Sequence, residues 1–107
     1  MEATDFLVDS IDDRGLVLGR NGQADIAVGS IFTEIQKIYA NEPHEIIYSI
    51  SLRLIEVYWY RRVIEVVPGG HTAALRLGGK GLNELQDALS KRNKFEYIKL
   101  VGSVHGS

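Results

Sequence analysis

The chain has 107 residues, with 12 Lys and Arg against 14 Asp and Glu, and no cysteine. This length fits one domain over residues 1–107. Without cysteine, disulfides, a thiol nucleophile, cysteine-ligated zinc and iron–sulfur clusters are excluded. No apolar run approaches the roughly 18 residues of a membrane span, and the acidic segment Met1 to Ser10 has no secretion signal. We expect a soluble cytoplasmic domain without membrane contact.

The net charge of −2 argues against non-specific binding of nucleic acid, which needs excess Lys and Arg to neutralise phosphates. The charge is uneven along the chain: residues 1–45 hold nine acids and three bases, and residues 46–107 hold five acids and nine bases. Either the two halves interleave in space, which we favour, or the molecule has an acidic and a basic face.

The first thirty residues predict short strands separated by turns. Asp5–Ile11 alternates apolar and polar residues, and Asp12–Gly15 is a turn sequence. Gly15–Gly19 is an apolar strand between two glycines. Asn21-Gly22 is a strong hairpin signal, and Ala24–Val28 alternates again.

Residues 30–39 fit two interpretations. Ile31, Ile35 and Ile38 have helical spacing and Ser30 could cap a helix. The segment is also rich in β-branched residues and lies among strand signals, so we favour a strand. A loop follows over residues 40–44, which include Pro43.

Residues 45–67 form the most apolar part of the chain. The alternation from Ile50 to Leu54 predicts a half-buried strand, and a further strand pair is expected up to Val67, bent at Tyr60–Arg62. Pro68–His71 is a turn. Thr72–Leu77 is the next strand, which we expect Gly78-Gly79 to end.

The C-terminal part predicts a single helix and a last strand. Asn83–Arg92 is helical, with Asn83 as its cap, Asn93 as its left-handed end, and Leu82, Leu85 and Leu89 as its apolar stripe. In the strand that follows, we expect Phe95, Tyr97, Lys99 and Val101 on one side and Ile98 and Leu100 on the other. Residues 103–107 are expected to be a frayed tail.

Short apolar runs with glycine-centred breaks are typical of an all-β sandwich or barrel. We therefore predict a mainly β fold, a small closed or partly open antiparallel β-barrel of about six strands with one short C-terminal helix. Because closure removes exposed strand edges, glycines are expected where such a barrel turns its corners.

The order of segments resembles the second, β-barrel domain of translational GTPases such as elongation factor Tu. The resemblance is carried by Phe6–Val8, Arg14–Arg20, Asp25–Ser30, Ile55-Glu56, Val66–Gly70 and Ala73–Gly79. It implies a freestanding barrel of this kind. GTP hydrolysis is not implied, because the chain has no phosphate-binding loop of the Gly-x-x-x-x-Gly-Lys-Ser/Thr type.

The most distinctive cluster is Tyr58-Trp59-Tyr60-Arg61-Arg62. Strand alternation would place Tyr58 and Tyr60 on one face and Trp59 on the other. Aromatic residues beside arginines could anchor a protein partner or stack on bases. The alternative is a core Trp59 flanked by tyrosines with solvated hydroxyls.

A weaker candidate is Lys80, which precedes the predicted helix in Gly78-Gly79-Lys80-Gly81 and could help to bind an anion. The alternative there is a flexible turn. His44, His71 and His105 lack metal-ligand spacing, and Asp12-Asp13 is an ordinary turn pair. We predict no catalytic residue, no metal and no cofactor.

The sequence therefore predicts a non-enzymatic binding module for a protein partner, with Tyr58, Tyr60, Arg61, Arg62 and Lys80 as candidate binding residues. An RNA- or ribosome-associated domain is the first alternative. A small enzyme subunit with an unrecognised site is the second. A homo-oligomer is also compatible with the apolar strands between Ile46 and Val67.

Overall fold

A computed structural model of the chain describes residues 3–22, 24–39 and 44–103. The fold is mainly β, with one short helix near the C-terminus. The elements in chain order are β1 (Ala3–Ile11), β2 (Val17–Asn21), β3 (Ile26–Ala27), β4 (Ile31–Tyr39), β5 (Glu45–Trp59), β6 (Arg62–Ile64), β7 (Val66–Val67), β8 (Thr72–Lys80), α1 (Leu82–Ser90) and β9 (Glu96–Ser103).

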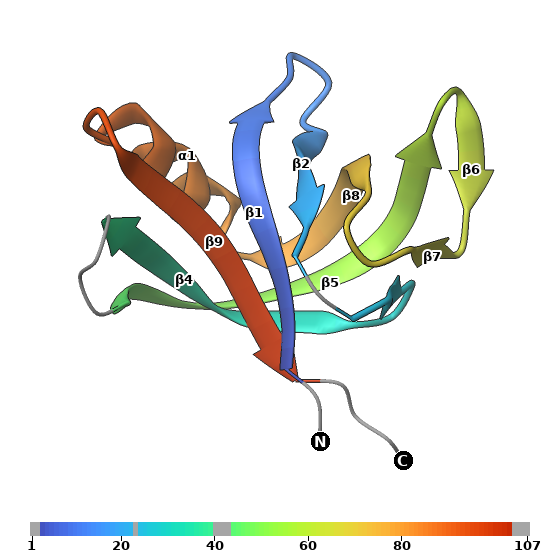
Figure 1. The fold of residues 1–107 in the computed structure, drawn as a ribbon, viewed down its shortest axis with the longest axis horizontal. Coiled ribbons are helices and arrows are strands. Elements are labelled where there is room, and N and C mark those ends of the chain that lie inside the picture. The colour runs from blue at the N-terminus through green and yellow to red at the C-terminus, as the bar shows by residue number, and fades with distance from the viewer. Residues whose placement is uncertain (1–2, 23, 40–43, 104–107) are drawn as a thin grey trace.

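Six strands form an antiparallel ring in the order β4-β9-β1-β2-β8-β5 (Figure 1). The ring closes because β4 pairs with β9 along one edge and with β5 along the other. Register shifts interrupt both β4 ladders, and the ring is not quite a regular barrel. The predicted fold class is therefore confirmed, as is the strand interpretation of residues 31–39.

Two smaller pairings complete the sheet structure. β6 continues along the edge of β5, and β3 pairs with β7 as a separate two-stranded sheet. The predicted strand pair bent at Tyr60–Arg62 is thus the β5–β6 hairpin.

One hydrophobic core fills the ring, because alternate residues of each strand point inward. Leu85 and Ala88 of α1 join this core, with Leu82 and Leu89 packed beside them. The fully buried large side chains are Phe6, Phe32, Ile26, Ile35, Leu52, Leu54, Leu75, Leu85, Ile98, Leu100, Val8 and Val17. The predicted apolar stripe of the helix is confirmed.

The hairpin predicted at Asn21-Gly22 is wrong. β2 and β3 do not pair; β2 lies between β1 and β8. Asn21 is the buried last residue of β2, and its side-chain amide donates hydrogen bonds to the carbonyl oxygens of Ala24 (2.7 Å) and Val67 (2.9 Å). A side-chain amide thus ties the end of β2 to the small β3–β7 sheet.

The predicted helix cap is also wrong. The helix begins after Gly81, and no side chain hydrogen-bonds to its first turn. Gly81 has a φ of 135°, and a Cβ there would lie 2.6 Å from Cγ2 of Ile50, so the position requires glycine. The preceding Gly78-Gly79 do not end β8, which continues through Lys80.

The segment after the helix differs from the prediction in its backbone. The helix ends before Lys91, and the residue with positive φ is Phe95 (71°) rather than Asn93. Phe95 therefore precedes β9 instead of belonging to it. Within β9 the predicted alternation is confirmed, with Ile98 and Leu100 buried. The strand continues through Ser103, and the rest of the predicted tail, residues 104–107, lies outside the described part of the chain.

The two halves of the chain interleave in the ring, as we favoured from the sequence. The ammonium of Lys99 on β9 lies 3.6 Å from a carboxylate oxygen of Asp5 on β1. Lys37 on β4 lies at the same distance from Glu96 on β9. In the part of the chain that the structure describes, no helix is long and apolar enough to cross a membrane.

Replacement of Asn21 tests the tie between β2 and the small sheet. Asn21→Ala leaves the buried Val67 carbonyl without its side-chain donor, and we expect the free energy of unfolding to fall by about 2 kcal/mol. Asn83→Ala is the matched control, because Asn83 is exposed and makes no cap hydrogen bond; we expect a change within about 0.5 kcal/mol. Urea unfolding followed by circular dichroism measures both. Equal losses in the two variants would contradict this role of Asn21.

Candidate functional site

A groove of about 690 Å³ crosses the outer face of β9, β1, β2, β8 and β5. Its floor is apolar. Leu7, Leu18 and Ala74 each adjoin an inward-pointing core residue on their strand, so strand alternation turns them outward. The register places Leu18 opposite Ala74, and Ala74 opposite Tyr58. These four side chains therefore lie in neighbouring strands across the groove.

The two walls come from distant parts of the sequence. Tyr58, Trp59 and Tyr60, at the end of β5, line one side, and Arg92 with Glu96 and Tyr97, around the start of β9, line the other. Figure 1 shows the β5–β6 hairpin and β9 on opposite sides of β1, β2 and β8. Tyr60 is 78% exposed and Tyr97 50% exposed, so both walls expose aromatic surface to the solvent.

The tip of the first wall has an unusual backbone. Trp59 pairs with Arg62, which leaves Tyr60 and Arg61 as a two-residue turn, with φ values of 48° and 68°. Positive φ at both central residues is the type I′ geometry, for which Asn-Gly is the favoured sequence. Bulky residues in this region cost about 1 kcal/mol or more each. Turn stability therefore does not explain the presence of Tyr60 and Arg61.

The alternation predicted for Tyr58, Trp59 and Tyr60 ends at the turn. Tyr60 leaves the strand, and its ring packs edge-on against Trp59, with 4.8 Å between ring centroids. Trp59 is only partly buried and also meets His71 edge-on at 5.7 Å. Its indole N–H is buried without an acceptor among the described residues. Trp59 therefore supports the exposed Tyr60 ring and is not a core residue of the ring of strands.

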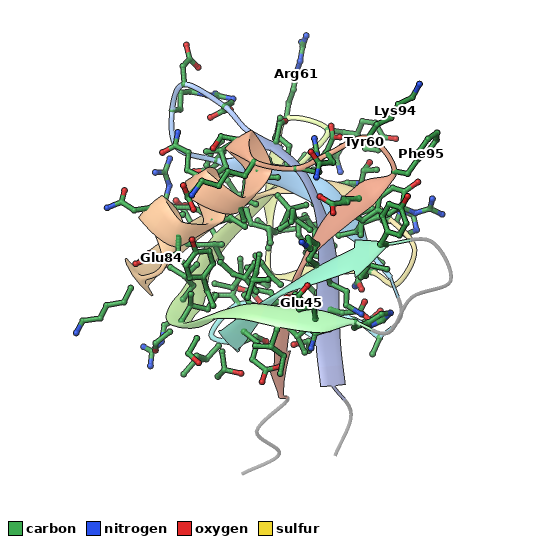
Figure 2. The ribbon with its side chains drawn as sticks, turned by 90° about the vertical axis from the view of Figure 1, so that its left-hand side faces the viewer. Glu45, Tyr60, Arg61, Glu84, Lys94 and Phe95 are labelled. Carbon is green, nitrogen blue, oxygen red and sulfur yellow. The ribbon has the colours of Figure 1, made fainter. Side chains whose placement is uncertain are left out.

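A second exposed aromatic residue has the same kind of backbone. Phe95 has a φ of 71° and is 62% exposed, and the ammonium of Lys94 lies 5.3 Å from the centre of its ring. In Figure 2, Tyr60, Arg61, Lys94 and Phe95 all project at the upper end of the molecule. Glu45 and Glu84 lie elsewhere in that view. Sequence reasoning placed Phe95 within a strand and so missed this tip.

Two guanidinium groups lie within the groove itself. Arg20 donates from Nε to the carbonyl oxygen of Gly70 (3.2 Å), and Arg92 donates to the carbonyl oxygens of Val8 and Asp9 (3.5 and 3.4 Å). These bonds use neutral acceptors, so they position the cations without neutralising them. Among the described residues, no carboxylate lies within 4.0 Å of the cationic groups around the groove, which are Arg20, Arg61, Arg62, Arg92 and Lys94.

The groove also holds two carboxylates, Asp9 and Glu96. Glu96 accepts a hydrogen bond from the backbone N–H of Asn93 (2.9 Å) and lies 3.6 Å from the ammonium of Lys37. The hydrogen bond from Asn93, followed by the attraction of Lys37, lowers the pKa of Glu96. Glu96 is therefore ionised at neutral pH, and it is paired with Lys37, whose ammonium also lies 3.7 Å from a carboxylate oxygen of Glu45.

The structure separates the predicted site residues into two places. Tyr58 and Tyr60 line the groove, and Arg61 and Arg62 are exposed at its hairpin tip. Lys80 lies at the other end of β8, opposite Ser51, and the structure does not bring it to the groove. Sequence reasoning missed the apolar floor and the β9 wall, because both arise from pairings between strands distant in the sequence.

A smaller hollow beside α1 has a structural explanation. The hydroxyl of Tyr48 on β5 donates to the carboxylate of Asp87 on α1, which also pairs with Lys91 at 3.1 Å. The hydrogen bond from Tyr48 and then the Lys91 ammonium lower the pKa of Asp87 below its ordinary value of 3.8, and the same hydrogen bond raises the pKa of Tyr48. This contact fastens the helix to the ring.

The fastening of α1 predicts a pH effect. Because the pKa of Asp87 is lower in the folded state, its stabilisation is present in full above about pH 3.8 and disappears as the pH falls through the lowered value. Asp87→Asn should therefore lower the urea midpoint near neutral pH and differ less from wild type at about pH 3. Asp13→Asn, at an exposed turn position, is the control and should change little at either pH. A deficit of Asp87→Asn that persists unchanged in acid would refute this explanation.

The turn geometry predicts a variant more stable than the natural chain. Combining Tyr60→Asn with Arg61→Gly supplies the sequence that a type I′ turn favours, and we expect the free energy of unfolding to rise by about 1 kcal/mol. Urea unfolding measures the change. A double variant that is less stable than wild type would show that Tyr60 and Arg61 serve the fold.

The chain matches no protein-family model, no curated protein and no solved structure in the comparisons made. The described residues contain no group of three His, Asp or Glu side chains that could hold a metal ion. The site is thus characterised by its lining: an apolar floor, aromatic side chains on both walls, and cations around the rim.

Proposed function

We propose that this chain is a non-enzymatic binding module that holds an extended segment of another protein in the groove between the β5–β6 hairpin and β9. The observation that carries the proposal is the strained turn. Tyr60 and Arg61 adopt left-handed backbone conformations at an exposed tip, where Asn-Gly would fit at lower cost. Strained backbone of this kind is concentrated at functional sites.

The residue types along the groove support a protein partner. Tyr, Trp and Arg dominate the binding energy of protein interfaces, and Tyr58, Trp59, Tyr60, Tyr97 and Arg92 supply all three types here. Tyr and Trp offer large contact areas at a low cost in side-chain entropy.

The dimensions of the groove also favour a short chain segment. The groove crosses five neighbouring strands, and strands lie about 4.8 Å apart, so its floor extends over about 19 Å. An extended peptide advances about 3.3 Å per residue. A segment of about six residues would therefore span the groove from Tyr97 to Tyr60.

Selection from a phage-displayed library of random peptides of about seven residues tests this proposal. The immobilised full chain should enrich a consistent set of peptides. Their affinity should fall at least about tenfold when Tyr60→Asn and Arg61→Gly are combined, since this variant loses the anchors while keeping the turn.

Lys80→Ala is the matched control, because Lys80 is exposed on the same sheet but away from the groove. It should leave affinity within about twofold of wild type. Absence of enrichment, or equal losses in the two variants, would refute the proposed function.

A further inference from the structure

We propose that the segment held in the groove is acidic, with Asp or Glu residues alternating with apolar ones. This inference rests on the proposed function and specifies the chemistry of the partner. It comes from the uneven pairing of charges around the groove.

The cations in and beside the groove have no carboxylate partner within 4.0 Å among the described residues. Arg20 and Arg92 donate to backbone carbonyl oxygens inside it, whereas Arg61 and Arg62 stand at the hairpin tip. Lys94 lies next to the opposite wall, between Arg92 and Glu96 in the chain, over the ring of Phe95. Positive charge therefore lies in the groove at Arg20 and Arg92, and beside both of its walls.

The lining carries less unpaired negative charge than unpaired positive charge. The carboxylate of Glu96 is already paired with Lys37, which leaves Asp9 as the lining carboxylate without an ion pair among the described residues. An acidic ligand would thus meet more unneutralised cations than anions. Such complementarity favours encounter and fixes orientation.

The floor sets the second requirement on the partner. Leu7, Leu18 and Ala74 are only partly buried, so an apolar side chain of the ligand can cover them. In an extended peptide, alternate side chains point to opposite sides. Apolar residues would lie on the floor, and the acidic residues between them would reach the arginines of the rim.

The same features disfavour a nucleic acid as occupant. The unpaired carboxylate of Asp9 lies in the lining, and the floor side chains Leu7, Leu18 and Ala74 are aliphatic, so bases could stack only on the aromatic walls. Among the described residues, Arg20 and Arg92 are the cations in the lining, and two cations do not form a continuous track for a phosphate backbone.

Fluorescence anisotropy with four labelled probes tests the inference on the full chain. The probes are peptides of about seven residues that alternate Glu with Leu, Gln with Leu, or Lys with Leu, and an oligouridine of about ten nucleotides. The Glu–Leu peptide should bind at least about tenfold more tightly than the Gln–Leu peptide, and its affinity should fall as salt is added. The Lys–Leu peptide and the oligouridine should bind more weakly still.

Two charge-reversal variants test whether the charge near the groove or the net charge of the whole protein determines the affinity. Arg61→Glu and Lys80→Glu change the net charge equally, but Arg61 adjoins Tyr60, which lines the groove, whereas Lys80 lies at the other end of β8. Arg61→Glu should lower the affinity for the Glu–Leu peptide at least about tenfold, and Lys80→Glu should lower it by less than about twofold. Equal effects of the two reversals would overturn the assignment of the acidic ligand to this groove.

The remaining outcomes distinguish this inference from the proposed function. If the Gln–Leu or Lys–Leu peptide binds as tightly as the Glu–Leu peptide and depends on Tyr60, the acidic partner is refuted while the groove stands as a protein-binding site. If only the oligouridine binds, and Arg61→Glu abolishes its binding, both proposals fail. If no probe binds, the acidic partner is refuted, and the peptide selection decides the function separately.

Discussion

The shape of the molecule depends on how β4 closes the ring and how far β5 extends beyond that closure. Phe32 and Ile35 of β4 are fully buried, and β4 pairs with β9 on one side and β5 on the other. The β4–β5 ladder ends at Arg53, whereas β5 continues to Trp59. β6 takes over the free edge of β5 from Val57 onward. Closure therefore leaves a hairpin projecting from the ring, and this hairpin is one wall of the groove.

This division separates the residues that stabilise the fold from those that we propose bind a partner. The core lies inside the ring and includes the buried face of α1, so its packing does not involve the outer face of the sheet. The turn can then keep Tyr60 and Arg61 in a strained backbone conformation, because the packing of the core fixes the position of the strands on either side of it. The central claim is that these residues, with the apolar floor and the opposite wall, form one recognition surface for an extended acidic segment.

Local patterns in the sequence predicted much of the fold. Alternation identified the strands, Asp12–Gly15 and Pro68–His71 identified two turns, and the leucine spacing identified the helix.

The errors have a common origin in long-range contacts. Asn21-Gly22 has the sequence of a hairpin turn, but the side chain of Asn21 is buried and donates a hydrogen bond to the carbonyl oxygen of Val67, 46 residues away. The glycine at position 81 begins the helix in place of a polar cap because Ile50 packs against it. Aromatic residues beside arginines indicated one wall of the site, but its floor and second wall depend on strand pairings that no local pattern shows. The resemblance to the second domain of translational GTPases stays a prediction.

Mapping of the bound surface tests the central claim most directly. The full chain, labelled with ¹⁵N, would be titrated with the Glu–Leu peptide while the chemical shifts of its backbone amides are recorded. The account predicts that the largest changes fall on Leu18, Ala74, Tyr97 and the turn at Tyr60–Arg61, with little change at Lys80 or along α1. Changes that gather on α1 and Lys80, or that spread evenly over the sheet, would contradict it.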